Sequence, residues 1–383
     1  MANDYSAALQ QIIASILLKA RAKAVASRLV NRQYDPVPAG IGEDIIVNIP
    51  SNYTALAITP GFAPTGGQDS KPTKVSTKLD QHYGVEVVVT DKDLGAIKDG
   101  SFDAEADSMA VALVEAINAS IYAETRMFWN ISGTAGTNPF QTDETPILNA
   151  ILALDTERTA SEGRKVVLSP AAKALAMKIA AFTRADARGD GKALVTGELG
   201  DVYGLGVFWD QLVYKHTSTP FTAGAATVNG VHAIGQGSTD GGRTGTLSVA
   251  KATNATNLIK GDVLTIAGDS QSYIVQADVT LAVGNTTVSI SPALRVAKAG
   301  AEAVTLIATR TIMPVFHPNA LTFACRKLAG LKGIGVIESR VDAQTGIAIT
   351  VELERQHFQS KMKVSCLWTV KAFRPEFGAQ MLG

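Results

Sequence analysis

Apolar residues recur at helical spacing from residue 5 to residue 29, close to the N-terminal end of the chain. This period predicts an amphipathic helix, and residues 31–36 end it because Pro36 disfavours helical backbone at the residue before it. We expect the helix to form an N-terminal arm. Its charged side chains are almost all basic, and they either face solvent or contact a neighbouring molecule. The contact candidates are Arg28 and Arg32.

Alternating apolar and polar residues replace the helical period between residues 44 and 90. They predict strands at 45–49, 55–58, 74–79 and 83–89. A loop rich in Gly and Pro, residues 59–72, separates the second strand from the third, so the segment is expected to form an extended hairpin. Because a two-stranded ribbon is marginally stable by itself, we expect the hairpin to lie across another subunit. Its candidate contact residues are Phe62, Pro64, Gly66 and Lys71.

The longest helical pattern runs from residue 101 to residue 129. Acidic residues occupy its first two turns, where the helix dipole favours them, and one apolar stripe follows its length. At 1.5 Å per residue such a helix is about 43 Å long, which suggests a spine. The candidates for contact between subunits on this stripe are Phe102, Met109, Leu113 and Ile121.

Short strands and helices alternate in the next part of the chain. The pattern predicts helices at 146–155 and 169–183 and a strand at 165–168, with Ser169 as N-cap and Pro170 in the first turn. Further strands are expected near the C-terminus, at 334–337, 347–354 and 362–370. Such alternation is typical of a mixed sheet covered by helices.

A segment of different composition interrupts this pattern between about residues 222 and 309. It is rich in Gly, Thr, Ser and Val, and runs of period two recur at 245–249, 263–267, 272–276, 286–290 and 303–307. Short strands at regular spacing indicate a small barrel or sandwich. We therefore expect an α+β protein in which a small β-domain is inserted into a host domain.

Composition limits the classes of function. The chain has 383 residues, 46% of them hydrophobic and 18% charged, which favours two or three compact units with apolar area left for partners. Lys plus Arg number 35, as do Asp plus Glu, so the formal net charge is zero. No broad positive electrostatic field therefore exists to attract nucleic acid or an anionic membrane. The N-terminus shows no secretion signal and no apolar run approaches the length of a membrane span, so we expect synthesis in a cytoplasm and no membrane partner.

Candidate chemistry is sparse. The 5 histidines lack metal-site spacing, no nucleophile elbow occurs, and residues 189–192 fail as a phosphate loop because Asp186 stands where its first glycine belongs. His317 is expected to be a structural residue that hydrogen-bonds near the start of an element. The 2 cysteines, Cys325 and Cys366, lie in apolar runs and favour buried thiols in a reducing compartment, with a disulfide as the alternative. We expect no catalytic residue, no cofactor and no metal.

The order of these elements resembles the major capsid proteins of tailed double-stranded-DNA bacteriophages, in the podovirus subtype that carries an inserted β-barrel domain. Residues 258–268, followed by 288–292, look like core strands of that domain. Residues 366–377, which contain Arg-Pro-Glu, look like its C-terminal strand, and Phe-His-Pro-Asn-Ala at 316–320 resembles a re-entry motif of capsid families.

The resemblance implies a Hong Kong ninety-seven-like capsid fold. Its parts would be an N-terminal arm (1–43), an extended hairpin loop with adjoining strands (44–90), a peripheral domain with the spine helix (91–130), an axial α/β domain (131–221 and 311–383) and a β-barrel insertion domain (222–310). The spine helix and the hairpin would govern contact between subunits, while the insertion would stabilise the subunit.

The resemblance also implies a function. The chain would assemble with itself, as hexamers and pentamers, into an icosahedral shell around a double-stranded DNA genome that it contacts weakly and without sequence preference. Its other partners would be a scaffolding protein, a portal protein and a decoration protein. It would be located in the virion capsid, after synthesis and assembly in the cytoplasm of a bacterial host.

Three alternatives stay open on the residues alone. An encapsulin-like cellular nanocompartment shell would have the same fold. A carbohydrate-binding or adhesin module would explain the Gly/Thr-rich insert, although its few aromatic residues, Phe221 and Tyr273, disfavour a sugar-stacking surface. An enzyme would need a catalytic group that the sequence does not reveal.

Overall fold

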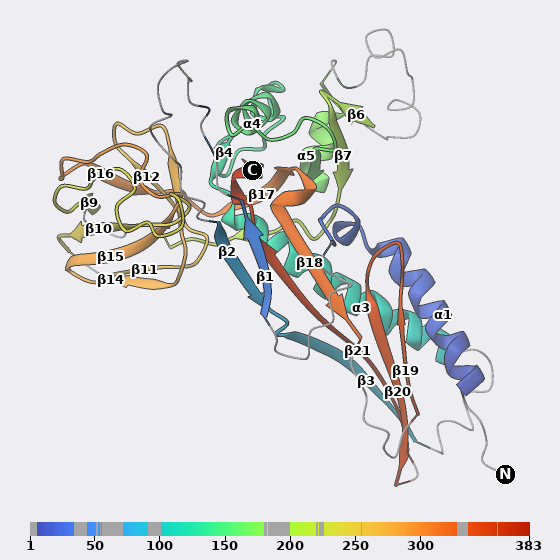
Figure 1. Cartoon of the computed structure of the whole chain (residues 1–383). Coiled ribbons are helices and arrows are strands. Elements are labelled where there is room, and N and C mark those ends of the chain that lie inside the picture. The colour runs from blue at the N-terminus through green and yellow to red at the C-terminus, as the bar shows by residue number, and fades with distance from the viewer. Residues whose placement is uncertain are drawn as a thin grey trace, which may run out of the picture.

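The longest strand, β21 (Gln359–Ala372), organises an antiparallel sheet, here called the β21 sheet, in the lower half of the molecule (Figure 1). Its other strands are β3 (Gln81–Thr90), β18 (Leu321–Arg326), β19 (Val336–Val341) and β20 (Ala348–Gln356). β3 pairs with one edge of β21, β18 and β20 follow each other along the opposite edge, and β19 pairs with β20. The computed structural model describes residues 6–33, 44–50, 53, 55, 72–90, 101–179, 182, 200–219, 221, 226–253, 255–327, 336–357 and 359–383.

Two helices, α1 (Ser6–Lys23) and α3 (Ser101–Glu124), pack on one face of the β21 sheet (Figure 1). Side chains of β21 alternate between the two faces, and those on the helical face form the main core. This core includes Ile13, Ile16, Leu113, Ile117, Ile349, Val351, Val364 and Trp368. Trp368 also donates a hydrogen bond from Nε1 to Ser120 Oγ of α3 (2.9 Å).

The arm helix is therefore part of the fold of its own chain. Besides its buried apolar stripe, Arg21 Nη2 of α1 lies 2.5 Å from Asp342 Oδ1, at the end of β19. A short 3-10 helix, Ala26–Arg28, follows α1. The predicted helix is confirmed, although it ends at Lys23 instead of residue 29, and its apolar stripe packs on its own chain.

α3 is shorter than the sequence suggested. It ends at Glu124, and a 3-10 helix (Thr125–Met127) leads into extended backbone at Phe128 and the strand β4 (Asn130–Ser132). With 24 residues it is roughly 36 Å long instead of about 43 Å. The apolar residues after Glu124 kept the helical period, but they belong to the turn that brings the chain into the next sheet.

A two-stranded ribbon, β1 (Asp44–Ile49) and β2 (Thr73–Lys78), lies over the other face of the β21 sheet. Its base packs on its own chain, because Ile45 and Leu79 share an apolar cluster with residues of β18 and β21, and Thr77 Oγ1 lies 2.9 Å from Thr369 Oγ1. The expectation that the hairpin lies across another subunit therefore does not hold for its base, which packs on its own chain. Residues 59–71, and the strand expected at 55–58 except Ala55, lie outside the described residues.

The upper half contains a mixed sheet, here called the β17 sheet (Figure 1). In spatial order its strands are β4, β22 (Gly378–Leu382), β17 (Arg310–Phe316), β5 (Lys165–Leu168), β7 (Leu205–Trp209) and β6 (Asp201–Val202), with β8 (Lys215–His216) also paired to β17. β4 and β22 are parallel to each other, and so are β5 and β7. This arrangement joins the C-terminus of the chain to the end of α3.

Two helices, α4 (Thr145–Thr156) and α5 (Pro170–Ala176), contribute the apolar residues that cover this sheet. The Ser169 cap is confirmed, since Ser169 Oγ accepts the Ala172 N–H (3.2 Å) and Pro170 opens α5. α5 has 7 residues and ends at Ala176 instead of 183. The apolar residues beyond it, such as Phe182, pack in the same core without continuing α5.

The inserted segment forms a closed barrel whose described strands follow the order β10–β15–β13–β12–β16–β9 (Figure 1). Their bounds are β9 (Ala226–Val228), β10 (Gly245–Lys251), β12 (Val263–Ile266), β13 (Ser272–Val275), β15 (Gly284–Ser291) and β16 (Ala303–Leu306). A separate pair, β11 (Thr256–Leu258) and β14 (Val279–Leu281), accompanies it. The five strands expected in this segment are confirmed, while β9, which closes the barrel between β10 and β16, was missed because it is only 3 residues long.

Two smaller expectations are also confirmed. His317 Nδ1 accepts the Asn319 N–H (3.2 Å) and so caps the 3-10 helix Pro318–Ala320. Cys325 and Cys366 are buried thiols whose Sγ atoms lie 3.2 Å apart and form no disulfide bond. Their hydrogen bond, together with burial, raises the pKa of the Cys366 thiol.

A buried ionic network lies in the barrel segment, at the turn between β12 and β13. Lys298 Nζ lies 2.8 Å from Asp269 Oδ2, both side chains are almost fully buried, and Tyr273 OH donates to the same carboxylate (2.8 Å). Burial by itself raises the pKa of Asp269, but hydrogen bonds from Lys298, the Gln271 amide and Tyr273 outweigh it and leave this pKa below its usual range.

This network makes barrel stability depend on pH. Because the folded-state pKa of Asp269 is depressed, its contribution is fully present above the unfolded value of about 3.9 and is lost as the pH falls through the lower folded value. We expect urea denaturation, followed by circular dichroism, to show lower stability below about pH 4. Asp269→Asn should flatten this pH dependence, and an unchanged slope in that variant would contradict the assignment.

Candidate functional site

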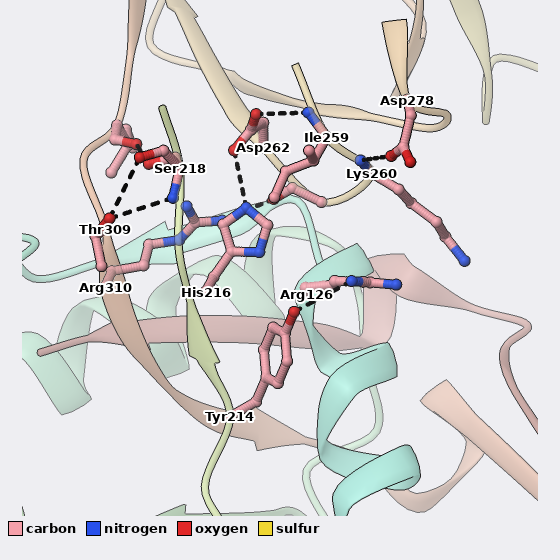
Figure 2. Close-up of polar contacts among 12 residues, drawn as sticks. Arg126, Tyr214, His216, Ser218, Ile259, Lys260, Asp262, Asp278, Thr309 and Arg310 are labelled. Carbon is pink, nitrogen blue, oxygen red and sulfur yellow. Dashed lines mark hydrogen bonds and ion pairs between the residues drawn. The ribbon is translucent and has the colours of Figure 1, made fainter. Parts of the chain in front are cut away.

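The most deeply buried polar cluster lies where the barrel joins the rest of the chain (Figure 2). The chain enters the barrel segment after β8 and leaves it before β17, and these two crossings pair with each other, Arg310 opposite His216. Just beyond them, Ser218 Oγ donates to the Ile307 carbonyl (2.9 Å) and the Ser218 N–H donates to Thr309 Oγ1 (3.2 Å). We call this region, with the barrel turn 259–262 above it, the junction.

An imidazole–carboxylate pair fixes the barrel turn. His216 Nε2 lies 2.8 Å from Asp262 Oδ1, and both side chains are 0% exposed. The other carboxylate oxygen, Asp262 Oδ2, accepts the Ile259 N–H (2.9 Å) and so closes the turn. Figure 2 shows the imidazole of His216 pointing up from β8 toward this carboxylate.

Arg310 connects the same turn to the β17 sheet. Its Nη2 donates to the Gly261 carbonyl (2.8 Å), and its Nε donates to Gln380 Oε1 of β22 (3.4 Å). Gln380 Nε2 in turn donates to the carbonyls of Arg126 and Phe128 at the end of α3. Burial lowers the pKa of Arg310 to about 10, against the raising effect of Asp262, so the guanidinium stays charged near neutral pH.

The end of α3 touches the barrel turn directly. Lys260 Nζ lies 3.1 Å from Glu124 Oε1, and Arg126 Nη1 donates to Tyr214 OH (3.2 Å). Gly261 has a φ of +95°, and a Cβ there would lie 2.6 Å from the Arg126 side chain. A glycine is therefore required both by the backbone and by this close approach.

The junction holds the barrel but offers no means of catalysis. A His–Asp pair orients a general base in many hydrolases. Here the Ser218 hydroxyl donates to a backbone carbonyl, and the pair has no exposed surface from which to reach a substrate. Within the described residues, no three His, Cys, Asp or Glu side chains gather in a way that could hold a metal. The described helices include none long and apolar enough to span a membrane.

The structure does not bring the predicted contact residues together. Met109, Leu113 and Ile121 are buried between α3, α1 and the β21 sheet, so in a single chain they have no surface to offer a second copy. On the outer side of α3 the exposed positions are Ser108, Ala112, Glu115 and Ala119. The apolar stripe was identified correctly, but what covers it is the chain itself.

The remaining candidates have different surroundings. Arg28 is exposed, and its guanidinium donates to the Arg21 carbonyl, while Arg32 is half-buried. Phe102 belongs to α3, but its side chain is outside the described part of the chain, as are Phe62, Pro64, Gly66 and Lys71 in full.

Sequence reasoning missed the junction. His216 and Asp262 are 46 positions apart, and neither has a sequence neighbour that suggests the other. One usable signal existed, since His216 and Arg310 are polar residues in strand-like runs on either side of the inserted segment. Such a pair at the two boundaries of an insertion is well placed to fix the insertion to its host.

The junction gives a direct test of its own strength. His216→Ala leaves a buried carboxylate without its partner, which should lower the free energy of unfolding by about 3–5 kcal/mol. The control is Glu86→Ala, which breaks the exposed pair between Lys361 Nζ and Glu86 Oε1 (3.7 Å) and should cost less than about 1 kcal/mol. Chemical denaturation measures both, and equal losses in the two variants would contradict the role of the junction.

The sequence itself matches no family model and no curated protein. Solved structures do match its fold. A structure from Mycobacterium phage Che8 aligns over 93% of this chain and 90% of its own, with 15% identity and a TM-score of 0.53. The capsid structure of the Cyanophage P-SCSP1u aligns over 92% of this chain and 85% of its own, with 13% identity and a TM-score of 0.50. The chain therefore shares its mixed α/β fold, over nearly its whole length, with phage structures that include a cyanophage capsid.

Proposed function

We propose that this chain is a major capsid protein that assembles with itself into an icosahedral shell around a double-stranded DNA phage genome. The observation that carries the proposal is the alignment of more than nine-tenths of the chain with the cyanophage capsid structure. The sequence adds independent support, since 35 basic and 35 acidic residues leave no net charge that would drive packed copies apart.

The proposal includes a division of the chain on the Hong Kong ninety-seven-like plan. Residues 1–43 are the N-terminal arm, 44–90 the extended hairpin loop and adjoining strands, and 91–130 the peripheral domain with the spine helix. Residues 131–221 and 311–383 form the axial domain, and 222–310 form the insertion domain. The break in composition at the insertion and the paired crossings at Arg310 and His216 support this division.

Among the candidate contacts, we propose that the hairpin residues Phe62, Pro64, Gly66 and Lys71 and the arm residues Arg28 and Arg32 meet neighbouring copies. Phe102 completes this set at the start of α3. The burial of Met109, Leu113 and Ile121 supports a different role for them, which is to hold α3 on the β21 sheet within the subunit.

The proposed partners are other copies of this chain in hexamers and pentamers, a scaffolding protein, a portal protein and a decoration protein. Contact with DNA is weak and independent of sequence, in keeping with the zero net charge. The proposed location is the virion capsid, after assembly in the cytoplasm of the bacterial host. We propose no enzymatic activity.

Electron microscopy of negatively stained samples tests the proposal. The purified chain, expressed alone and together with a candidate scaffolding protein, should form closed shells or partial shells of uniform curvature. Shells that contain a cargo enzyme instead of DNA in the native host would favour the nanocompartment alternative. Small discrete particles in both samples, with the scaffolding protein of the same phage present, would overturn the proposal.

The hairpin gives a second test. Deletion of residues 64–71 should leave a folded, soluble subunit that cannot close shells, because the base of the ribbon packs on its own chain and does not need the loop. The control replaces the same residues with a Gly/Ser linker of equal length, which separates loss of reach from loss of side chains. Circular dichroism checks the fold, and closed shells from the deletion variant would contradict the role of the hairpin.

A further inference from the structure

One exposed apolar surface lies on α4, in the upper half of the molecule. Leu148 is 42% exposed and Leu152 is 64% exposed, and at a spacing of four residues they lie side by side on the helix. The buried residues Ile147, Ala150 and Leu154 face the β17 sheet. No charged residue occurs between residues 146 and 154. We call Leu148 and Leu152 the helix surface.

A second exposed apolar surface lies at the far edge of the same sheet. Tyr203 and Trp209 are each 47% exposed, and Phe208 is 37% exposed. Phe208 and Trp209 are successive residues of β7, so their rings point to opposite faces of the sheet and flank its edge. No described strand pairs with the outer side of β7 at these two residues. We call the three residues the aromatic edge.

The backbone at the tip of this edge is strained. Tyr203 has a φ of +52° and is followed by Gly204 with a φ of +76°, in the tight turn between β6 and β7. Asn or Gly is the usual residue at the first of these positions. The Tyr203 ring lies against Phe182 of its own chain, with the ring centroids 6.1 Å apart. The turn therefore holds one side of the Tyr203 ring against its own chain and leaves the rest of the side chain exposed.

The two surfaces carry complementary charges at their borders. Asp143 and Glu144 precede α4 beside the helix surface, and neither is buried. At the aromatic edge Lys173 supplies the positive charge, with its Nζ 4.4 Å from the centroid of the Trp209 ring, while the exposed Asp201 lies on β6. Within one chain the surfaces lie apart, since α4 packs over β4, β22 and β17, whereas β7 is separated from β17 by β5 (Figure 1).

From these observations we infer that the helix surface of one copy binds the aromatic edge of the next copy. Attraction between Lys173 of one copy and Asp143 and Glu144 of the next favours this head-to-tail contact. A symmetric contact of helix surface against helix surface would instead bring Asp143 and Glu144 near the same residues of the partner, which costs free energy. The contact leaves a helix surface free on one side of each pair and an aromatic edge on the other, so it propagates from copy to copy. The inference rests on the proposed self-assembly and names the surfaces that carry it.

Two double variants test the contact. Leu148→Ser with Leu152→Ser removes the helix surface, and Phe208→Ser with Trp209→Ser removes the aromatic edge. Each should raise the protein concentration needed for assembly at least about tenfold. Val231→Ser with Ile234→Ser is the matched control, because these residues are 80% and 67% exposed in the barrel segment, to which we assign no contact between copies. Circular dichroism and denaturation midpoints confirm that all three variants fold.

A charge exchange tests the direction of the contact. Lys173→Glu and Asp143→Lys should each weaken assembly, and the combination of both in one chain should restore it, because the two sites meet only between copies. Light scattering measures assembly as a function of concentration. Wild-type assembly by both serine variants, or failure of the charge exchange to restore assembly, would overturn this contact while the proposed function stands. Failure of the unmodified chain to form shells would instead count against the proposed function.

Discussion

The position of the barrel depends on one buried set of polar contacts. The chain passes into the barrel and out of it through two adjacent crossings, and Arg310, His216 and Asp262 tie these crossings to the turn at 259–262. Buried charges are costly unless they are paired, so the arrangement is stable only when every partner is in place. Because the contacts of Arg310 continue through Gln380 to the 3-10 helix that follows α3, the barrel is held both to the β17 sheet and to the segment after α3.

The core of one copy is complete without a neighbour. The apolar stripes of α1 and α3 are covered by the β21 sheet, and the base of the ribbon rests on β18 and β21. Apolar side chains exposed outside this core, such as those on α4 and at the edge of β7, remain available for association. A chain with such a core folds first and, under the proposed function, then associates through its surface, so the stability of the single chain and the affinity between copies can change separately.

Much of the fold could be predicted from the sequence, because the spacing of apolar residues along a short stretch of chain identifies helices and strands well. Five strands of the barrel, the cap at Ser169 and the helix α1 all follow from residues close together in the chain. The end of α3 was placed too late because Met127 and Phe128 kept the apolar period through a turn. β9 was missed because a strand of 3 residues has too few positions to show alternation.

The candidate site was much less predictable. A stripe such as Met109, Leu113 and Ile121 shows that a helix buries one face, but it does not show whether the chain itself or a second copy covers that face. The junction is also invisible to local patterns, since His216 meets a carboxylate 46 positions away. Pairing of this kind depends on the tertiary fold, and only the structure reveals it.

The central claim is that one copy contains a complete core and that association uses side chains outside it. Hydrogen–deuterium exchange of assembled shells and of subunits dissociated from them tests this claim most directly. The account predicts equal, strong protection of amides in β20, β21 and the junction in both states, with added protection in the shell confined to surface elements. Rapid exchange in β20 and β21 of the dissociated subunit would contradict it, because the core would then be completed only by neighbouring copies.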